Sequence, residues 1–254
     1  MKILNNISLP ATREEALEEC KKECPGPEKC SHGGEILYQP HSDVYGPYFI
    51  ECPIYNKWKH QMDLNKRIMD AIPKKFWDRS LENFQPYNKD LKAALNIAQK
   101  YAANKAWSMG ANLIFLGRYG VGKTHLMAGI AREAIKNGYI AVFIVASSLT
   151  FSDLNEIKTL FKKIRDVDLV AIDDVSTETE HKFILSEIFD LINYRYEAEK
   201  GLLLSSNLQP SEFKKTLGER ILDRLIERSV FLNISNTESY RKRKRTDYLG
   251  WMKG

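Results

Sequence analysis

The chain has 254 residues, of which 43% are hydrophobic and 28% charged, and its formal net charge is +5. This length fits one large or two modest domains, and the composition excludes a collagen-like or wholly disordered chain. The longest apolar run, residues 140–146, is far shorter than the roughly 20 residues of a membrane span, and no signal-like stretch follows Met1. We therefore expect a cytoplasmic protein without membrane contact.

Residues 1–70 are predicted to form a small N-terminal domain. Thr12 and Glu15 have the spacing of a capping box, which predicts a short helix starting there. The Gly- and Pro-rich stretch that follows has too few apolar residues to build a core without an additional staple or a partner.

The four cysteines all lie in this first region. In an intracellular protein such clustering favours a metal over disulfides, and four thiolates suit tetrahedral Zn²⁺. Either His32 or His41 is an alternative ligand, while packed unligated thiols and an iron–sulfur cluster are alternative states. The predicted zinc ligands are Cys20, Cys24, Cys30 and Cys52.

Residues 71–109 are expected to be a helical linker, broken at Pro73, with one helix over residues 90–107. Residues 110–235 alternate short apolar runs with amphipathic segments, which is typical of a parallel sheet buried on both faces. We therefore predict a three-layer α/β domain with a five-stranded parallel sheet. Its strands are expected at residues 113–116, 140–146, 169–172, 202–204 and 230–232, with helices including 124–137 and 181–196.

A phosphate-binding loop is the strongest motif of the chain. Residues 117–124 match the pattern G-x-x-x-x-G-K-[ST] between a predicted strand and a predicted helix. Glycines let backbone amides turn toward phosphate oxygens, the lysine reaches the β and γ phosphates, and the threonine hydroxyl ligates Mg²⁺. The predicted nucleotide contacts are Gly117, Gly120, Val121, Gly122, Lys123, Thr124 and His125.

Two carboxylates end the predicted strand at residues 169–172. Asp173 is placed to hold the Mg²⁺ through water, and Asp174 to polarise the attacking water. A solvated strand end is the alternative interpretation. Asn207, which follows the next strand, is a candidate for orienting the same water.

Arg220 and Arg224 are spaced i, i+4 on one predicted helix. A guanidinium presented from a helix can complete the nucleotide site of a neighbouring subunit. Alternatively, either arginine pairs with a nearby carboxylate such as Glu219, Asp223 or Glu227. The sequence does not choose between the two arginines.

These motifs occur in the order found in AAA+ ATPases. The chain resembles the DnaC/DnaI-type replicative helicase loaders. The resemblance lies in the segments 217–224 and 238–241, and in Ile72-Pro73 and residues 81–84 before the loop. The IstB-type transposition helper ATPases are a sister family. The resemblance implies an adenine wall at Phe84, and a helical lid that is absent or vestigial.

The resemblance also implies what the protein does. A loader of this type binds ATP and Mg²⁺, associates with itself, contacts single-stranded DNA and places a hexameric replicative helicase on DNA, gripping it through its N-terminal domain. Asp174 stands where most AAA+ members have Glu, so we expect weak, partner-stimulated ATP hydrolysis. The rival hypotheses are a transposition helper ATPase and an ATP-gated interaction module or helicase inhibitor with little turnover.

Two basic segments are candidate DNA contacts. Between the second and third strands, residues 148–166 carry Lys158, Lys162, Lys163 and Arg165. The tail, residues 236–254, has six basic and two acidic residues, including the run 241–245 followed by Tyr248 and Trp251. Basic residues neutralise phosphates and aromatic rings stack on unpaired bases, whereas the alternative for both segments is a solvated charged surface.

Overall fold

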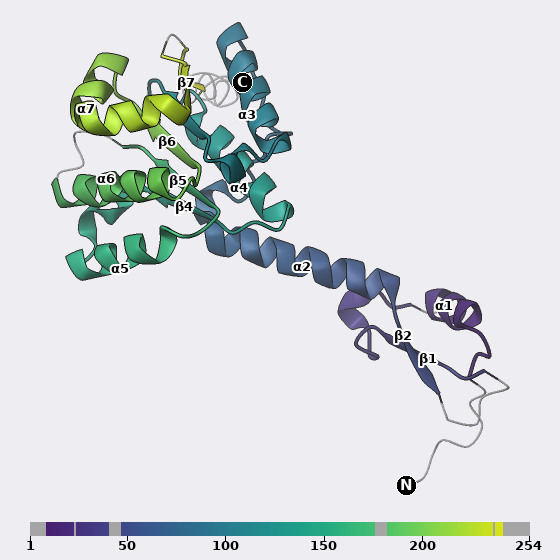
Figure 1. Cartoon of the computed structure of the whole chain (residues 1–254). Coiled ribbons are helices and arrows are strands. Elements are labelled where there is room, and N and C mark those ends of the chain that lie inside the picture. The colour runs from purple at the N-terminus through teal and green to yellow at the C-terminus, as the bar shows by residue number, and fades with distance from the viewer. Residues whose placement is uncertain (1–8, 23, 41–46, 176–181, 236, 241–254) are drawn as a thin grey trace. The chain divides into compact units, whose positions relative to one another are not determined.

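The computed structural model describes residues 9–22, 24–40, 47–175, 182–235 and 237–240. The chain divides into two compact units, residues 1–66 and residues 67–254. Figure 1 colours the ribbon by residue number, from purple at the N-terminus to yellow at the C-terminus. Among the described residues, no helix is both long and apolar enough to cross a lipid bilayer.

The first unit contains a helix, a two-stranded antiparallel sheet and most of a second helix. The predicted capping box is present, because the Glu15 amide donates to Thr12 Oγ1 (3.1 Å) and the Thr12 amide donates to Glu15 Oε2 (3.2 Å). Strands β1 and β2 pair with Leu37 opposite Phe49. The elements are α1 (Arg13–Lys22), the 3₁₀ turn η1 (Pro27–Lys29), β1 (Glu35–Tyr38), β2 (Tyr48–Glu51) and α2 (Pro53–Ala71), whose last turn belongs to the second unit.

The second unit is an α/β domain in which five strands form one parallel sheet in the order β4-β5-β6-β3-β7. The strands are β3 (Asn112–Leu116), β4 (Ala141–Val145), β5 (Leu169–Asp173), β6 (Leu202–Ser206) and β7 (Ser229–Asn233). The helices are α3 (Lys89–Ala103), α4 (Lys123–Lys136), α5 (Leu154–Ile164), α6 (Lys182–Glu197) and α7 (Pro210–Arg228), with 3₁₀ turns η2 (Lys74–Phe76), η3 (Ala106–Met109) and η4 (Ala146–Phe151). This confirms the predicted five-stranded parallel sheet.

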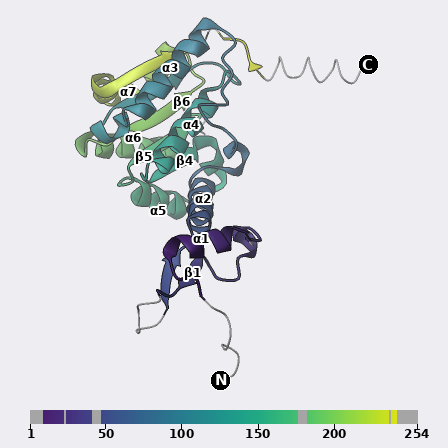
Figure 2. The ribbon, with the colours of Figure 1, turned by 90° about the vertical axis from the view of Figure 1, so that its right-hand side faces the viewer.

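Helices cover both faces of the sheet. Helix α4 packs on one face with α3 against it, and α5, α6 and α7 form a row on the other face, as Figures 1 and 2 show. The central strands β3, β5 and β6 are buried along their whole length, which explains their uninterrupted apolar runs. The helix expected over residues 90–107 ends at Ala103, because Lys105 adopts a left-handed backbone conformation (φ 51°) before η3 begins.

Arg195 on α6 ties the beginnings of β5 and β6 together. Its fully buried guanidinium donates to the carbonyls of Arg165, Val167, Asp168 and Gly201 at 2.6–3.2 Å. Burial lowers the pKa of Arg195 to about 10, so the group remains charged at neutral pH. These bonds hold the amino-terminal edge of the sheet, opposite the edge at which the predicted site residues end their strands.

Candidate nucleotide-binding site

The predicted phosphate loop connects β3 to α4. The Gly117 amide donates to the Ser206 carbonyl of the neighbouring strand β6 (3.1 Å), which fixes where the loop leaves the sheet. Gly120 and Gly122 have φ angles of 77° and 105°, which residues that carry a Cβ rarely adopt. The loop therefore needs glycine at these positions to turn tightly into the start of α4.

Lys123, the first residue of α4, points back into the loop. The residue is 7% exposed, and Nζ donates to the carbonyls of Gly117 (2.6 Å) and Arg118 (3.0 Å). A buried ammonium is costly unless it is paired, and these two carbonyls are among its partners. The positive charge thus lies inside the turn of the loop.

An acidic group lies beside the loop at the carboxyl end of β5. Asp173 is buried and accepts a hydrogen bond from Thr124 Oγ1 (2.7 Å) on one oxygen and from the Ser205 hydroxyl on the other. Asp174 adopts φ 63°, and its amide donates to Ser205 Oγ (2.9 Å). Hydroxyl and carboxylate oxygens are the ligands that Mg²⁺ prefers, so Thr124 and Asp173 fit that ion.

The remaining candidates for catalysis lie on or beside β6 and α7. Asn207 directly follows β6, the strand between β5 and β3, and is partly exposed. Helix α7 is kinked at Gly218 (φ 73°), and both arginines lie after the kink.

The structure distinguishes the two arginines, which the sequence did not. Arg224 Nη1 donates to Asn193 Oδ1 (2.8 Å) and Glu197 Oε1 (3.3 Å) of α6, and its guanidinium lies 5.2 Å from the Tyr196 ring centre. Arg220 is exposed, and within the described part of the chain it makes no hydrogen bond or ion pair. Arg220 is therefore the arginine available to another molecule.

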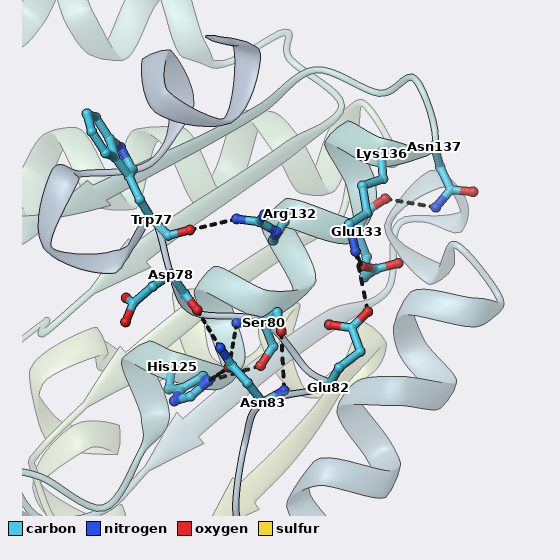
Figure 3. A network of polar contacts seen from close by, with 10 residues as sticks. All are labelled: Trp77, Asp78, Ser80, Glu82, Asn83, His125, Arg132, Glu133, Lys136 and Asn137. Atoms are coloured by element: carbon cyan, nitrogen blue, oxygen red, sulfur yellow. Dashed lines mark hydrogen bonds and ion pairs between the residues drawn. The ribbon is translucent and has the colours of Figure 1, made fainter. Parts of the chain in front are cut away.

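Residues 77–84 form a segment that is docked on α4, and Figure 3 shows its polar contacts. Ser80 and Asn83 bond each other reciprocally, from the Ser80 amide to Asn83 Oδ1 (3.0 Å) and from the Asn83 amide to Ser80 Oγ (3.2 Å). His125 Nε2 lies 3.0 Å from the Ser80 carbonyl oxygen and 2.8 Å from Asn83 Oδ1. Arg132 Nη1 donates to the Trp77 carbonyl (2.6 Å).

His125 therefore joins this segment to the residue that follows the phosphate loop. Both neighbours of its Nε2 are acceptors, so this nitrogen carries the proton. Burial lowers the pKa of His125, which favours the neutral form of the ring. The His125 and Phe84 rings also pack in a T-shaped arrangement, with centroids 5.0 Å apart.

Two glycines let the segment approach α4 closely. A Cβ at Gly122 would lie 2.8 Å from the Phe84 ring, and one at Gly129 would lie 2.8 Å from Leu81 Cδ2 and 2.9 Å from the Leu81 amide nitrogen. Leu81 and Phe84 are both buried as a result. The segment thus places Phe84 directly against the phosphate loop.

A cavity of about 390 Å³ lies between the loop, residues 75–91 and the segment after β7. It brings together seven predicted nucleotide contacts: Phe84, Gly120, Val121, Gly122, Lys123, Thr124 and His125. Eight further residues line it that were not among the predicted contacts: Lys75, Phe76, Arg79, Asn83, Gln85, Tyr87, Leu91 and Tyr240. No motif singles these residues out, except that Asn83 and Tyr240 fall in the family-like segments 81–84 and 238–241.

The four cysteines of the first unit gather without forming a ligand set. The Cys20 thiol has its pKa raised by burial first, and then by the nearby Cys52, Cys24 and Cys30. Among the described residues, however, no three His, Cys, Asp or Glu side chains are arranged to hold a metal ion. Of the two alternative ligands, His32 belongs to no such group, and His41 lies outside the described residues.

The predicted DNA-contact segment becomes η4 and α5. Lys158, Lys162 and Lys163 are exposed, whereas Arg165 lies over the Tyr194 ring (4.7 Å). Sequence reasoning missed Phe151, the last residue of η4, which is 97% exposed. The basic run 241–245, Tyr248 and Trp251 lie outside the described residues.

Comparisons with known proteins place the chain in a family. Residues 57–247 match the family of the IstB-like ATP binding protein. The replicative helicase loader DnaC of Escherichia coli strain K12 is 31% identical over 174 residues, which cover 65% of this chain and 69% of that protein.

Solved structures agree with the sequence matches. A crystal structure of the DnaC helicase loader has a TM-score of 0.57 and 25% identity, over 64% of this chain and 99% of that one. A crystal structure of DnaI, at 19% identity and a TM-score of 0.57, covers 66% of this chain and 93% of that one and shares the fold. The chain belongs to the IstB-like family of ATP-binding proteins and, within it, to the DnaC type of AAA+ proteins.

The close contact at Gly129 leads to a stability prediction. Alanine has a helix propensity about 1 kcal/mol better than glycine, but its Cβ would displace Leu81. We expect the steric term to win, so that Gly129→Ala lowers the melting temperature. The loss should shrink in a Leu81→Ala background, which a double-mutant cycle measures. A Gly129→Ala variant more stable than wild type would contradict this packing.

Proposed function

We propose that this chain is an ATP-dependent loader of a replicative DNA helicase. Its membership of a family of ATP-binding proteins and its similarity to proteins named replicative helicase loader support the proposal. The observation that carries it is the site itself, where the buried Lys123 ammonium lies inside the phosphate loop beside the Thr124–Asp173 pair. This combination suits a nucleoside triphosphate and Mg²⁺.

In this proposal each residue of the loop has a distinct task. The amides of residues 117–124 donate to phosphate oxygens, and Lys123 exchanges its two carbonyl partners for the β and γ phosphates. Thr124 and Asp173 would hold Mg²⁺. The ion, when bound, neutralises charge on the transferred phosphoryl group. Phe84 provides an apolar wall for the base.

Hydrolysis is assigned to two polar side chains at the strand ends. Asp174 polarises the attacking water, and Asn207 helps to orient it. The bond from the Asp174 amide to Ser205 fixes the backbone from which this carboxylate projects. Because Asp is one methylene shorter than Glu, turnover is slow, and the site acts largely as a switch between nucleotide states.

Self-association completes the site in this proposal. Arg220 acts in trans on the nucleotide of a neighbouring copy, since Arg224 is held by α6 within its own chain. A guanidinium at this place stabilises negative charge in the transition state.

Single-stranded DNA is proposed to run along η4 and α5. Three exposed lysines of α5 track the phosphates, while Phe151 stacks on a base.

The first unit is proposed to bind the helicase. There the four thiols bind zinc, which requires them to lose their protons and close to about 2.3 Å from one ion.

A second candidate function is that of a transposition helper ATPase, favoured by the match to the IstB-like family. The two functions share the nucleotide site and differ in the protein partner. Co-purification with a hexameric replicative helicase, with and without ATP, supports the loader, whereas binding to a transposase instead supports the helper.

The nucleotide assignment predicts the effect of Lys123→Ala. Loss of the ammonium should weaken ATP binding roughly 100-fold, which corresponds to about 3 kcal/mol. Isothermal titration of the purified chain measures this, with Lys100→Ala on the exposed face of α3 as the control. Unchanged affinity in Lys123→Ala would overturn the assignment.

The trans role of Arg220 predicts complementation between two inactive variants. Arg220→Ala should bind ATP yet lose ATPase activity, and Asp174→Asn should do the same. A mixture of the two should regain activity, because about a quarter of the interfaces in a random ring combine the intact acid with the intact arginine. Absence of recovery, together with inactivity of Arg224→Ala alone, would instead assign the role to Arg224.

The DNA path predicts the effect of removing one exposed ring. Phe151→Ala should weaken binding of a single-stranded oligonucleotide roughly 10-fold, since one base–aromatic stack contributes about 1–3 kcal/mol. Stability should not change, because the ring is 97% exposed. Met109→Ala removes another exposed apolar side chain and serves as the control. Equal affinities measured by fluorescence anisotropy would contradict the proposed path.

The zinc proposal is checked by metal analysis. The purified chain should contain about one zinc ion, and Cys52→Ser should lower this content. A chain that contains no zinc when purified would show unligated cysteines instead.

A further inference from the structure

The chain that follows β7 crosses back over the phosphate loop. We call Ile234, Ser235 and residues 237–240 the C-terminal strap. The Ile234 amide donates to the Leu116 carbonyl (2.8 Å), and the Tyr240 amide donates to the Gly120 carbonyl (2.9 Å). A Cβ at Gly117 would lie 3.0 Å from the Ile234 backbone, so the loop is shaped to admit the strap.

The strap is also fastened to the beginning of α3. The Tyr87 hydroxyl donates to the Glu238 carbonyl, and Asn88 Nδ2 donates to Thr237 Oγ1 (3.2 Å). Asn88 caps α3 at the same time, by accepting from the Leu91 amide (2.8 Å). Thr237 is 3% exposed, so the middle of the strap is buried rather than lying loosely on the surface.

An aromatic pair brings the strap to the cavity. The rings of Tyr87 and Tyr240 stack with centroids 6.5 Å apart and an interplanar angle of 25°. Both residues line the cavity together with Gly120 and Phe84. Tyr240 is 43% exposed, which leaves part of its ring for a ligand to cover.

We propose that docking of the strap and binding of nucleotide are coupled, with Tyr240 as a positioning residue of the nucleotide site. This inference rests on the proposed ATP binding. The strap holds one carbonyl of the phosphate loop and contributes one wall of the same cavity. A nucleotide that orders the loop and covers the Tyr240 ring therefore favours the docked strap, and by linkage the docked strap favours the nucleotide.

Two variants and one control test the coupling. Tyr87→Phe removes only the hydroxyl that holds the Glu238 carbonyl, and we expect ATP affinity to fall roughly fivefold, the scale of one net hydrogen bond. Tyr240→Ala removes the ring but keeps the amide, and we expect a fall of roughly tenfold. Tyr194→Phe removes the hydroxyl that donates to Asp166, far from the cavity lining, and should bind ATP as wild type does.

Hydrogen–deuterium exchange of the peptide that contains Tyr240 separates coupling from a purely structural role. If Tyr240 were only structural, ATP would not change the exchange rate of this peptide. In the wild type and in Tyr194→Phe, saturating ATP should slow exchange of the Tyr240 amide. In Tyr87→Phe the same saturation should slow it less. Two results would overturn the coupling. One is wild-type ATP affinity in both Tyr87→Phe and Tyr240→Ala, and the other is exchange of the Tyr240 amide that ATP leaves unchanged.

Failure of this inference is distinguishable from failure of the proposed function. If wild-type protein binds no ATP, the proposed function itself fails. If wild-type protein binds ATP through Lys123, and Tyr87→Phe and Tyr240→Ala bind ATP with the same affinity, only the coupling fails.

Discussion

The bond from the Lys123 ammonium to the Gly117 carbonyl, 2.6 Å long, holds a buried positive charge inside a loop of backbone dipoles. A buried charge is tolerated only where acceptors surround it, and here two carbonyls of the loop itself are among them. Phosphate oxygens are stronger acceptors than carbonyls, which is why this arrangement favours a triphosphate. The rest of the site is organised around that charge.

The parallel sheet determines what surrounds the loop. Because all five strands run in one direction, β3, β5 and β6 deliver the loop, Asp173 and Ser205 to the same edge, where a hydroxyl joins each side of the carboxylate. Arg195 fixes the opposite edge through backbone carbonyls. The segment carrying Phe84 and the strap carrying Tyr240 then line the cavity, each in contact with the loop through one of its glycines.

Much of this arrangement could be predicted from the sequence, because it depends on local patterns. Uniform apolar runs predicted the buried strands, and the glycine spacing with Lys123 and Thr124 predicted the loop. Contacts between distant backbones leave no such pattern, so neither the Tyr240–Gly120 bond nor the cavity wall at Tyr87 was expected. The choice between Arg220 and Arg224 required the face of α6, which sequence spacing does not give. Cysteine spacing favoured zinc, but spacing does not fix how four thiols face one another.

The most direct test is a crystal structure of the chain with Mg²⁺ and a non-hydrolysable ATP analogue. The account predicts the triphosphate within residues 117–124, Lys123 Nζ turned from the Gly117 carbonyl to the β and γ phosphates, and the metal between Thr124 and Asp173. An analogue bound elsewhere, with Lys123 still on the loop carbonyls, would contradict it.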